Sequence, residues 1–191
     1  MKEFYKYRIL QNGFEITEFC KLLNTEGVRS YLEIGSKFGG SFWRVGCSLP
    51  RGSRLVSVDF RDTKNEDGSL HKQPASLAKC VSELNRHGYD AHLIVGNSRD
   101  ADTIAKAAAL GPYDAVFIDA DHSVEGVTLD WENYGPLGRI VAFHDVAWNE
   151  EFQNRKGIRV PVFWNEIKKK YRYTELKYEI PGKAGIGVLW R

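Results

Sequence analysis

The chain is poor in the residues that mark several classes of protein. Its 191 residues include three cysteines, Cys20, Cys47 and Cys80, with no C-x-x-C pair among them. An odd number of unpaired cysteines favours reduced thiols over a disulfide framework or a zinc site. No run approaches the roughly 18 apolar residues of a membrane helix, and residues 1–6 lack the apolar segment of a signal peptide. We therefore expect a cytoplasmic protein with no membrane partner.

An excess of charge of one sign is also missing. Lys and Arg number 27 and Asp and Glu 25, which leaves a net charge of +2. This balance disfavours nucleic acid as a partner, because nucleic-acid binding draws on an excess of positive charge. The 42% of hydrophobic and 27% of charged residues are typical of a globular protein. The length predicts one domain over residues 1–191, with an N-terminal helical extension at 1–27 and a core at 28–191.

Short apolar runs alternate with helical patterns along the chain. Five runs are nearly continuous in apolar character, as parallel strands covered on both faces are: 30–34, 54–58, 91–95, 115–118 and 139–143. Two further strand-like runs, 173–180 and 185–190, flank a Pro-Gly turn and predict an antiparallel hairpin. The order predicts an α/β fold: a Rossmann-like, doubly wound sheet of five parallel strands plus a C-terminal antiparallel hairpin.

Polar and glycine residues follow the first two predicted strands, where ligands bind in such sheets. The turn at residues 33–41 is rich in glycine, which lets the backbone approach a ligand, and a helix predicted to start near Ser41 points free N–H groups at it. The spacing is not the dinucleotide fingerprint G-x-G-x-x-G, and the carboxylate of Glu33 suits a cation better than a pyrophosphate. Asp59 ends the second strand and suits the hydroxyls of a ribose. A turn without a ligand and an exposed loop carboxylate are the alternative interpretations.

Several motifs carry a specific resemblance. The Glu-x-Gly-x-x-x-Gly turn at 33–39 and Asp59 after the second strand resemble class I S-adenosylmethionine-dependent methyltransferases. The segments FIDADHSVEG at 117–126 and FHD at 143–145 narrow the resemblance to the methyltransferase-24 family, a small-molecule O-methyltransferase-like branch. The closing GIGVL at 185–189 is similar to the last strand of that family. The resemblance covers about residues 28–190 and implies the seven-stranded class I methyltransferase fold.

The resemblance implies S-adenosylmethionine as cofactor and assigns residues to it. Glu33 and the glycines of the turn would line its methionine and ribose, and Asp59 would hold the ribose hydroxyls, with Phe60 beside the adenine. Asn97 and Ser98 would also lie by the adenine, and Asp119 near the sulfonium. The full expected set is Glu33, Gly35, Ser36, Gly39, Gly40, Ser41, Asp59, Phe60, Asn97, Ser98 and Asp119.

The candidate catalytic residues follow the fourth and fifth strands. They are Asp119, His122, His144 and Asp145. Methyl transfer to a hydroxyl needs a base or a metal to take the proton. Metal-dependent O-methyltransferases that resemble this chain bind Mg²⁺ at positions that Asp119 and Asp145 match, but Val146 stands where a third oxygen ligand is expected. The alternative is His144 or His122 as general base. In an extended chain His144 and Asp145 point to opposite sides, so we expect only one of them to face the cofactor.

The leading hypothesis is an S-adenosylmethionine-dependent methyltransferase that acts on a hydroxyl of a small molecule or sugar. A catalytically inactive cofactor-binding module is the alternative from another class. A nicotinamide-dependent oxidoreductase is disfavoured by Glu33 and the missing fingerprint. Because the core uses nearly all of the chain, little is left for a separate substrate-recognition domain. Selectivity for the acceptor would come from residues 1–27, from the polar segment 61–73 or from residues 146–160, or from a second subunit of a homodimer. The segment 61–73 would be a lid or a surface loop, and Trp148 would cover the substrate.

Overall fold

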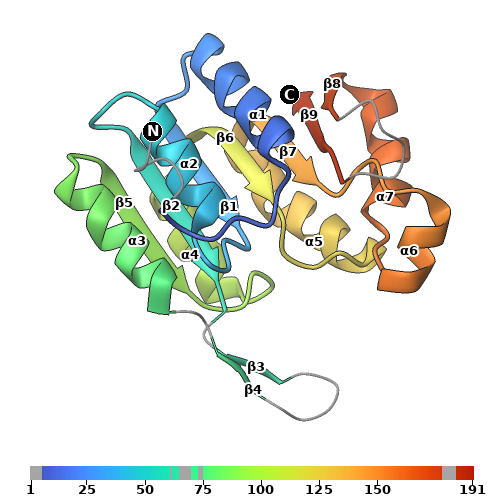
Figure 1. The fold of residues 1–191 in the computed structure, drawn as a ribbon, viewed down its shortest axis with the longest axis horizontal. Coiled ribbons are helices and arrows are strands. Elements are labelled where there is room, and N and C mark those ends of the chain that lie inside the picture. Colours follow the sequence, from blue (N-terminus) through green and yellow to red (C-terminus); the bar gives the residue numbers. More distant parts are fainter. Residues whose placement is uncertain (1–5, 61, 65–69, 73–74, 178–183) are drawn as a thin grey trace.

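A seven-stranded sheet forms the centre of the protein in the computed structural model, which describes residues 6–60, 62–64, 70–72, 75–177 and 184–191 (Figure 1). In spatial order its strands are β5 (Asp90–Val95), β2 (Arg54–Asp59), β1 (Ser30–Ile34), β6 (Tyr113–Ile118), β7 (Gly138–His144), β9 (Ile186–Trp190) and β8 (Arg172–Leu176). The first five are parallel, whereas β9 runs antiparallel to both β7 and β8. The predicted α/β fold is thereby confirmed; most of the predicted link at 181–184 lies outside the described residues.

Helices cover both faces of the sheet. One face packs against α1 (Gly13–Thr25), α2 (Gly40–Ser48) and α3 (Ala75–Arg86), and the other against α4 (Ala101–Ala109), α5 (Val124–Tyr134) and α7 (Val160–Ile167). Successive strand residues enter opposite cores, Tyr31 on the first face and Leu32 on the second, because side chains alternate along a strand. Trp43 and Trp164 are fully buried, one on each face, as expected of core residues.

The first helix is part of this packing. Asn12 caps α1 through its side chain, and Glu15 completes a capping box by accepting a hydrogen bond from the backbone N–H of Asn12. The apolar side of α1 carries Ile16 and Phe19, both with no exposed surface. The Phe19 ring lies 5.2 Å from that of Phe117 in β6. The N-terminal extension therefore packs directly on the sheet.

Two elements differ from the sequence prediction. The polar segment expected as a lid or loop contains a hairpin of β3 (Asp62–Lys64) and β4 (Leu70–Lys72), which projects from the body of the protein in Figure 1. The rest of that segment lies outside the described residues. A short helix, α6 (Glu150–Lys156), follows β7 and has no buried residue, so it leaves no apolar periodicity to predict it by. The 3₁₀ turns η2 (Gly135–Leu137) and η3 (Lys168–Lys170) complete the order.

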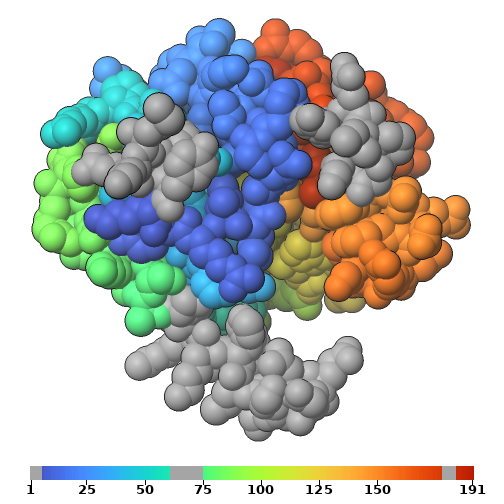
Figure 2. Space-filling view, in the orientation of Figure 1, coloured from blue at the N-terminus to red at the C-terminus, as the bar shows by residue number. Residues whose placement is uncertain are grey.

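The beginning of the chain lies across one face of the molecule. Figure 2 shows the segment after residue 6 in dark blue on the surface, next to α2 and α3. The backbone of this segment passes so close to Gly40 that a side chain there would lie 2.1 Å from the carbonyl oxygen of Arg8. Glycine at position 40 therefore makes room for the segment. Within the described part of the chain, no helix is both long and apolar enough to span a membrane.

Candidate active site

A cavity of about 1210 Å³ opens at the carboxyl ends of the parallel strands. Its wall comes from the loops after β1, β2, β5, β6 and β7, from the chain before and at the start of α1, and from residues of and around α6. The predicted cofactor residues on this wall are Gly35, Ser36, Gly40, Ser41, Asp59, Phe60, Asn97, Ser98 and Asp119. All four candidate catalytic residues also line it. The fold thus brings together side chains from five separate loops.

The turn after β1 depends on glycine. Gly35 has φ +90°, and a Cβ there would lie 2.3 Å from the main-chain oxygen of Asp119. Only a residue without a side chain allows the β1 turn to lie against the β6 loop this closely. The backbone N–H of Asp119 donates to the carbonyl of Ile34 at 2.9 Å and joins the two loops. The floor of the cavity is therefore a tight backbone contact.

Asp59 fixes the same turn from the end of β2. Its Oδ2 accepts the backbone N–H of Lys37 at 2.5 Å. Burial raises the pKa of Asp59, while hydrogen bonds from the backbone of Lys37, Phe60 and Ser36 favour the charged form. Asp59 both lines the cavity and holds the glycine turn, where a ligand's hydroxyl groups would meet a carboxylate.

Glu33 lies behind the cavity wall rather than on it. It has no exposed surface, and the hydroxyls of Tyr31 and Ser41 each donate to its carboxylate at 2.6 Å. Burial raises the pKa of Glu33 to about 7, although these hydrogen bonds oppose the rise. Gly39 is also absent from the wall; it packs against Cys80, whose side chain a Cβ at position 39 would meet at 3.1 Å. Both residues shape the cavity from behind, whereas the sequence analysis expected them to line it.

His144 ends β7 and is enclosed by carboxylates. Its Nδ1 lies 3.2 Å from Oδ1 of Asp119, and its Nε2 lies 3.1 Å from Oε1 of Glu15. Burial alone lowers the pKa of this imidazole, but Asp119, Glu15 and Asp145 outweigh it and raise the pKa well above the usual value. Both ring nitrogens already have partners. His144 is therefore a buried imidazolium that holds the surrounding carboxylates together.

Asp145 lies beside His144 instead of pointing away from it. Its φ of +63° places it in the left-handed region, so the strand alternation ends at His144 and both side chains reach the same cavity. The expectation that only one of them would face the site is thus wrong. The indole N–H of Trp148 donates to Oδ1 of Asp145 at 2.6 Å. Burial acts to raise the pKa of Asp145, but His122 and His144 lower it.

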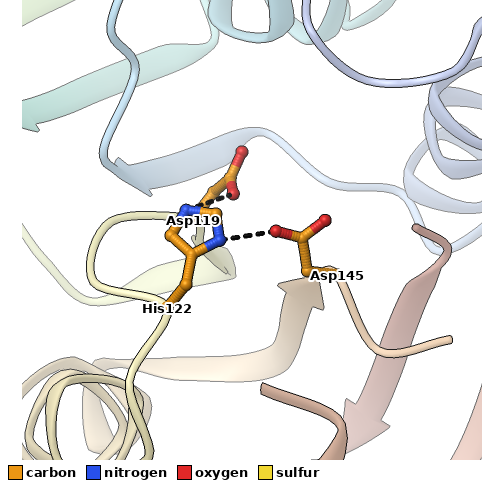
Figure 3. A group of neighbouring side chains, drawn as sticks. All are labelled: Asp119, His122 and Asp145. Atoms are coloured by element: carbon orange, nitrogen blue, oxygen red, sulfur yellow. Dashed lines mark ion pairs between the residues drawn. The ribbon is translucent and has the colours of Figure 1, made fainter. Parts of the chain in front are cut away.

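His122 bridges Asp119 and Asp145 (Figure 3). Its Nδ1 lies 2.5 Å from Oδ2 of Asp145, and its Nε2 lies 3.8 Å from Oδ1 of Asp119. Burial lowers the pKa of His122, but the two carboxylates raise it overall. The side chain keeps 38% of its surface exposed, against 8% for His144. Asp121, in contrast, pairs with Arg99 away from this group.

Two residues at the start of the chain complete the site and escape the sequence analysis. Gln11 donates from Nε2 to Oδ2 of Asp119 at 2.5 Å. Glu15, with 1% of its surface exposed, accepts the backbone N–H of Gly185 at 2.8 Å in addition to facing His144. The capping-box spacing of Asn12 and Glu15 is visible in the sequence, but it indicates a helix start and not a partner 129 residues away.

The donor set does not fit Mg²⁺. A magnesium ion needs near-octahedral oxygen ligands, whereas Val146, buried and apolar, takes the expected third position. Ligand atoms of Asp119, His122 and Asp145 lie within 4.8 Å of one another, but the imidazoles pair directly with the carboxylates. The 2.5 Å between His122 and Asp145 leaves no room for an ion between these two atoms. These residues form a network of carboxylate–imidazole pairs.

The sheet order, the glycine turn after β1 and the acid after β2 define a class I S-adenosylmethionine-dependent methyltransferase. Residues 32–146 match the methyltransferase-24 family, described as a methyltransferase domain. The chain belongs to this family.

Solved structures share the fold at low sequence identity. An O-methyltransferase from Bacillus cereus in complex with SAH is 16% identical, with a TM-score of 0.66 over 94% of this chain and 82% of that one. The O-methyltransferase TomG from Streptomyces achromogenes, involved in tomaymycin synthesis and in complex with SAM, is 16% identical, with a TM-score of 0.62 over 92% and 78%. A methyltransferase from Geobacter sulfurreducens is 14% identical, with a TM-score of 0.59 over 92% and 77%. Among curated proteins, none matches this sequence.

Proposed function

We propose that the protein transfers a methyl group from S-adenosylmethionine to a hydroxyl of a small molecule, with His122 as general base. The observation that carries the proposal is the pairing of His122 with Asp145 on the wall of the cavity. An imidazole whose one nitrogen is held by a carboxylate has its other nitrogen free to accept a proton. Nε2 of His122 has this position, because Oδ1 of Asp119 lies 3.8 Å from it, beyond hydrogen-bond distance.

The cofactor fits the wall formed by the turns after β1, β2 and β5. Asp59 would accept hydrogen bonds from the ribose hydroxyls, with Phe60, Asn97 and Ser98 around the adenine. Gly35 and Ser36 would contact the methionine part, and Asp119 would face the sulfonium. When bound, S-adenosylmethionine supplies an electrophilic methyl group on a positively charged sulfur.

The network then handles the acceptor's proton. Nε2 of His122 accepts the proton as the hydroxyl oxygen attacks, and Asp145 stabilises the imidazolium that forms. His144 is unsuited to this step, because Glu15 and Asp119 occupy both of its nitrogens. Its role is to hold Asp119 in place. The chemistry needs no metal, since the imidazole itself accepts the proton.

The test compares His122→Gln with His144→Gln. Loss of a general base lowers the rate of the chemical step by a factor of 10² to 10⁴, so His122→Gln should lose activity while S-adenosylhomocysteine still binds within about threefold of the native affinity. His144→Gln should in addition lose thermal stability, because it removes the imidazole that pairs with the carboxylates of Glu15 and Asp119. Full activity in His122→Gln would refute the assignment of the base.

A screen with hydroxylated aromatic, sugar and aliphatic acceptors separates an enzyme from an inactive binding module. The enzyme forms S-adenosylhomocysteine with at least one acceptor, and His122→Gln abolishes that product. A module binds the cofactor by calorimetry but releases no product with any acceptor. The His122–Asp145 pair favours the enzyme, because its half-exposed imidazole faces the cavity and a binding module has no use for a proton acceptor there.

A further inference from the structure

One wall of the cavity remains after the cofactor has been assigned. It comes from the segment after β7 and consists of Trp148, Phe152, Lys156 and Ile158. This segment follows β7, which is the second strand along the sheet from β1 and its glycine turn, with β6 between them. It adjoins the proposed base, because Trp148 donates to Asp145. On the proposed function, this wall is where an acceptor lies.

A stacked pair of aromatic rings forms the middle of the wall. The rings of Trp148 and Phe152 stack with centroids 3.7 Å apart and planes 12° from parallel. The hydrogen bond of the indole N–H to Asp145, at 2.6 Å, fixes the tryptophan ring. The carbonyl of Trp148 accepts from the side chain of Gln153 at 2.7 Å and restrains its backbone. A rigid aromatic face of this kind favours the stacking of a planar ring.

Charge is uncompensated at one point of the same wall. Each carboxylate that lines the cavity has a partner. Glu15 pairs with His144, Asp121 with Arg99 and Asp145 with His122, while Asp59 accepts the backbone N–H of Lys37 and Asp119 accepts the side chain of Gln11. Lys156 also lines the cavity and forms no ion pair with any residue that the structure describes. It lies four residues after Phe152 in α6, and hence on the same side of the helix.

The other cations of the cavity lie elsewhere. Arg8 and Lys37 both approach the ring of Phe38, at 4.7 and 5.6 Å from its centroid, in and next to the glycine turn. Both therefore lie beside the glycine turn rather than on the wall after β7. Arg99 is already paired with Asp121. Lys156 is therefore the cation left for a negative group on the acceptor.

We propose that the acceptor is a planar hydroxylated ring with an anionic substituent, stacked on Trp148 with its anion at Lys156. A phenolic hydroxyl suits the base, because its pKa of about 10 is far nearer to that of an imidazole than the pKa of an aliphatic alcohol is. The anion pairs with the ammonium group of Lys156. Among the described residues that form this wall, no other free cation is present. The ring, the hydroxyl and the anion are thus each matched by a named side chain.

The test measures binding and turnover separately. Dihydroxybenzoate and the neutral dihydroxybenzyl alcohol are titrated by calorimetry into protein saturated with S-adenosylhomocysteine. We expect the acid to bind about tenfold more tightly, a difference of about 1.4 kcal/mol. In Lys156→Met this ratio should fall below about twofold. Lys170→Met, which removes the same charge from an exposed position outside the cavity wall, should keep it.

Equal binding of acid and alcohol to the native protein overturns the inference, as does a ratio that survives in Lys156→Met. So does the absence of binding by either ring at millimolar concentration. Turnover then distinguishes this inference from the proposed function. Lys156-dependent binding of the acid without a methylated product leaves the acceptor subsite standing and refutes O-methylation at this ring. Methylation of the neutral ring without preference supports O-methylation and refutes the subsite.

Discussion

The carboxylate of Glu15, in the first helix, lies 3.1 Å from Nε2 of His144, at the end of the strand β7. Both side chains are buried, and the other oxygen of Glu15 accepts the backbone N–H of Gly185. One carboxylate therefore joins the first helix, the carboxylate–imidazole network of the cavity and the last strand. The proposed acid–base site thus includes a contact from a residue outside the part of the chain matched by the family.

Removal of the Glu15 carboxylate should destabilise the protein strongly. Glu15→Ala leaves a buried imidazolium with one partner fewer and the N–H of Gly185 unsatisfied, which we expect to cost about 3 kcal/mol. Denaturant unfolding measures this change in the free energy of unfolding. Glu18→Ala, in the same helix but partly exposed and paired only with Lys21, should stay within about 0.5 kcal/mol of native. Equal effects of the two substitutions would contradict the role of Glu15.

The pH dependence of activity should report the pairing of His122 and Asp145. Asp145 raises the pKa of His122, and His122 must be neutral to accept a proton, so the rate should rise with pH through this pKa. Asp145→Asn removes the negative charge, and the rising limb of the kcat profile should move to lower pH while kcat falls. An unmoved limb, measured across pH 5 to 9, would show that another group titrates.

Asp59→Ala should weaken cofactor binding. The substitution removes the carboxylate that would accept the ribose hydroxyls and also releases the backbone N–H of Lys37. Hydrogen bonds to a charged group contribute about 1.5–3 kcal/mol, so we expect the Kd for S-adenosylhomocysteine to rise by about 10- to 100-fold. Asp90→Ala, at the start of β5 and away from the cavity wall, is the matched control. An unchanged Kd in Asp59→Ala would place the ribose elsewhere.

Glu33 should make stability depend on pH near neutrality. Its pKa rises from 4.5 to about 7 on folding, so the native state holds a proton that the unfolded chain releases. The resulting stabilisation is complete below about pH 4.5 and is lost as the pH rises through 7. Its size is about 3 kcal/mol. From pH 4.5 to 8 the free energy of unfolding should therefore fall by about 3 kcal/mol more in the native protein than in Glu33→Gln. Denaturant unfolding at each pH measures this difference. Parallel curves would show that Glu33 is not the group responsible.

Magnesium should not be needed for activity. The carboxylates of Asp119 and Asp145 are already paired with imidazoles, and Val146 offers no oxygen ligand. Exhaustive treatment with EDTA should therefore leave the rate of methyl transfer within about twofold, and added Mg²⁺ should not raise it. A rate that collapses on chelation and returns with Mg²⁺ would contradict this prediction.

The parallel sheet could be predicted from the sequence because its strands are apolar on both faces. The runs at 30–34 and 115–118 fall inside β1 and β6, and both contribute residues to each core. Helix α6 could not be predicted, since none of its residues is buried. Strands β3 and β4 could not be predicted either, because each spans only three residues of a polar segment. Where burial leaves no pattern, the sequence has no periodic signal to interpret.

The candidate site was predictable only where residues follow a strand end. Asp119 and Asp59 stand at such ends, and the topology alone brings them to one edge of the sheet. The joint approach of His144 and Asp145 depends on a left-handed backbone conformation at a non-glycine residue, which residue type does not indicate. Glu15 and Gln11 reach the site through contacts across more than 100 residues, and a single sequence has no means of indicating such a pair.

The bond between Glu15 and Gly185 has a consequence for biosynthesis. A domain begins to fold from its N-terminal part as the ribosome delivers it. Helix α1 and the parallel strands emerge early, but His144 gains its full surroundings only when residue 185 has left the exit tunnel and closed over Glu15. Until then the nascent chain holds a buried acid with one acceptor oxygen unused. The surroundings of His144 are therefore complete only after the last strand has docked, although Glu15 precedes Gly185 in the chain by 170 residues.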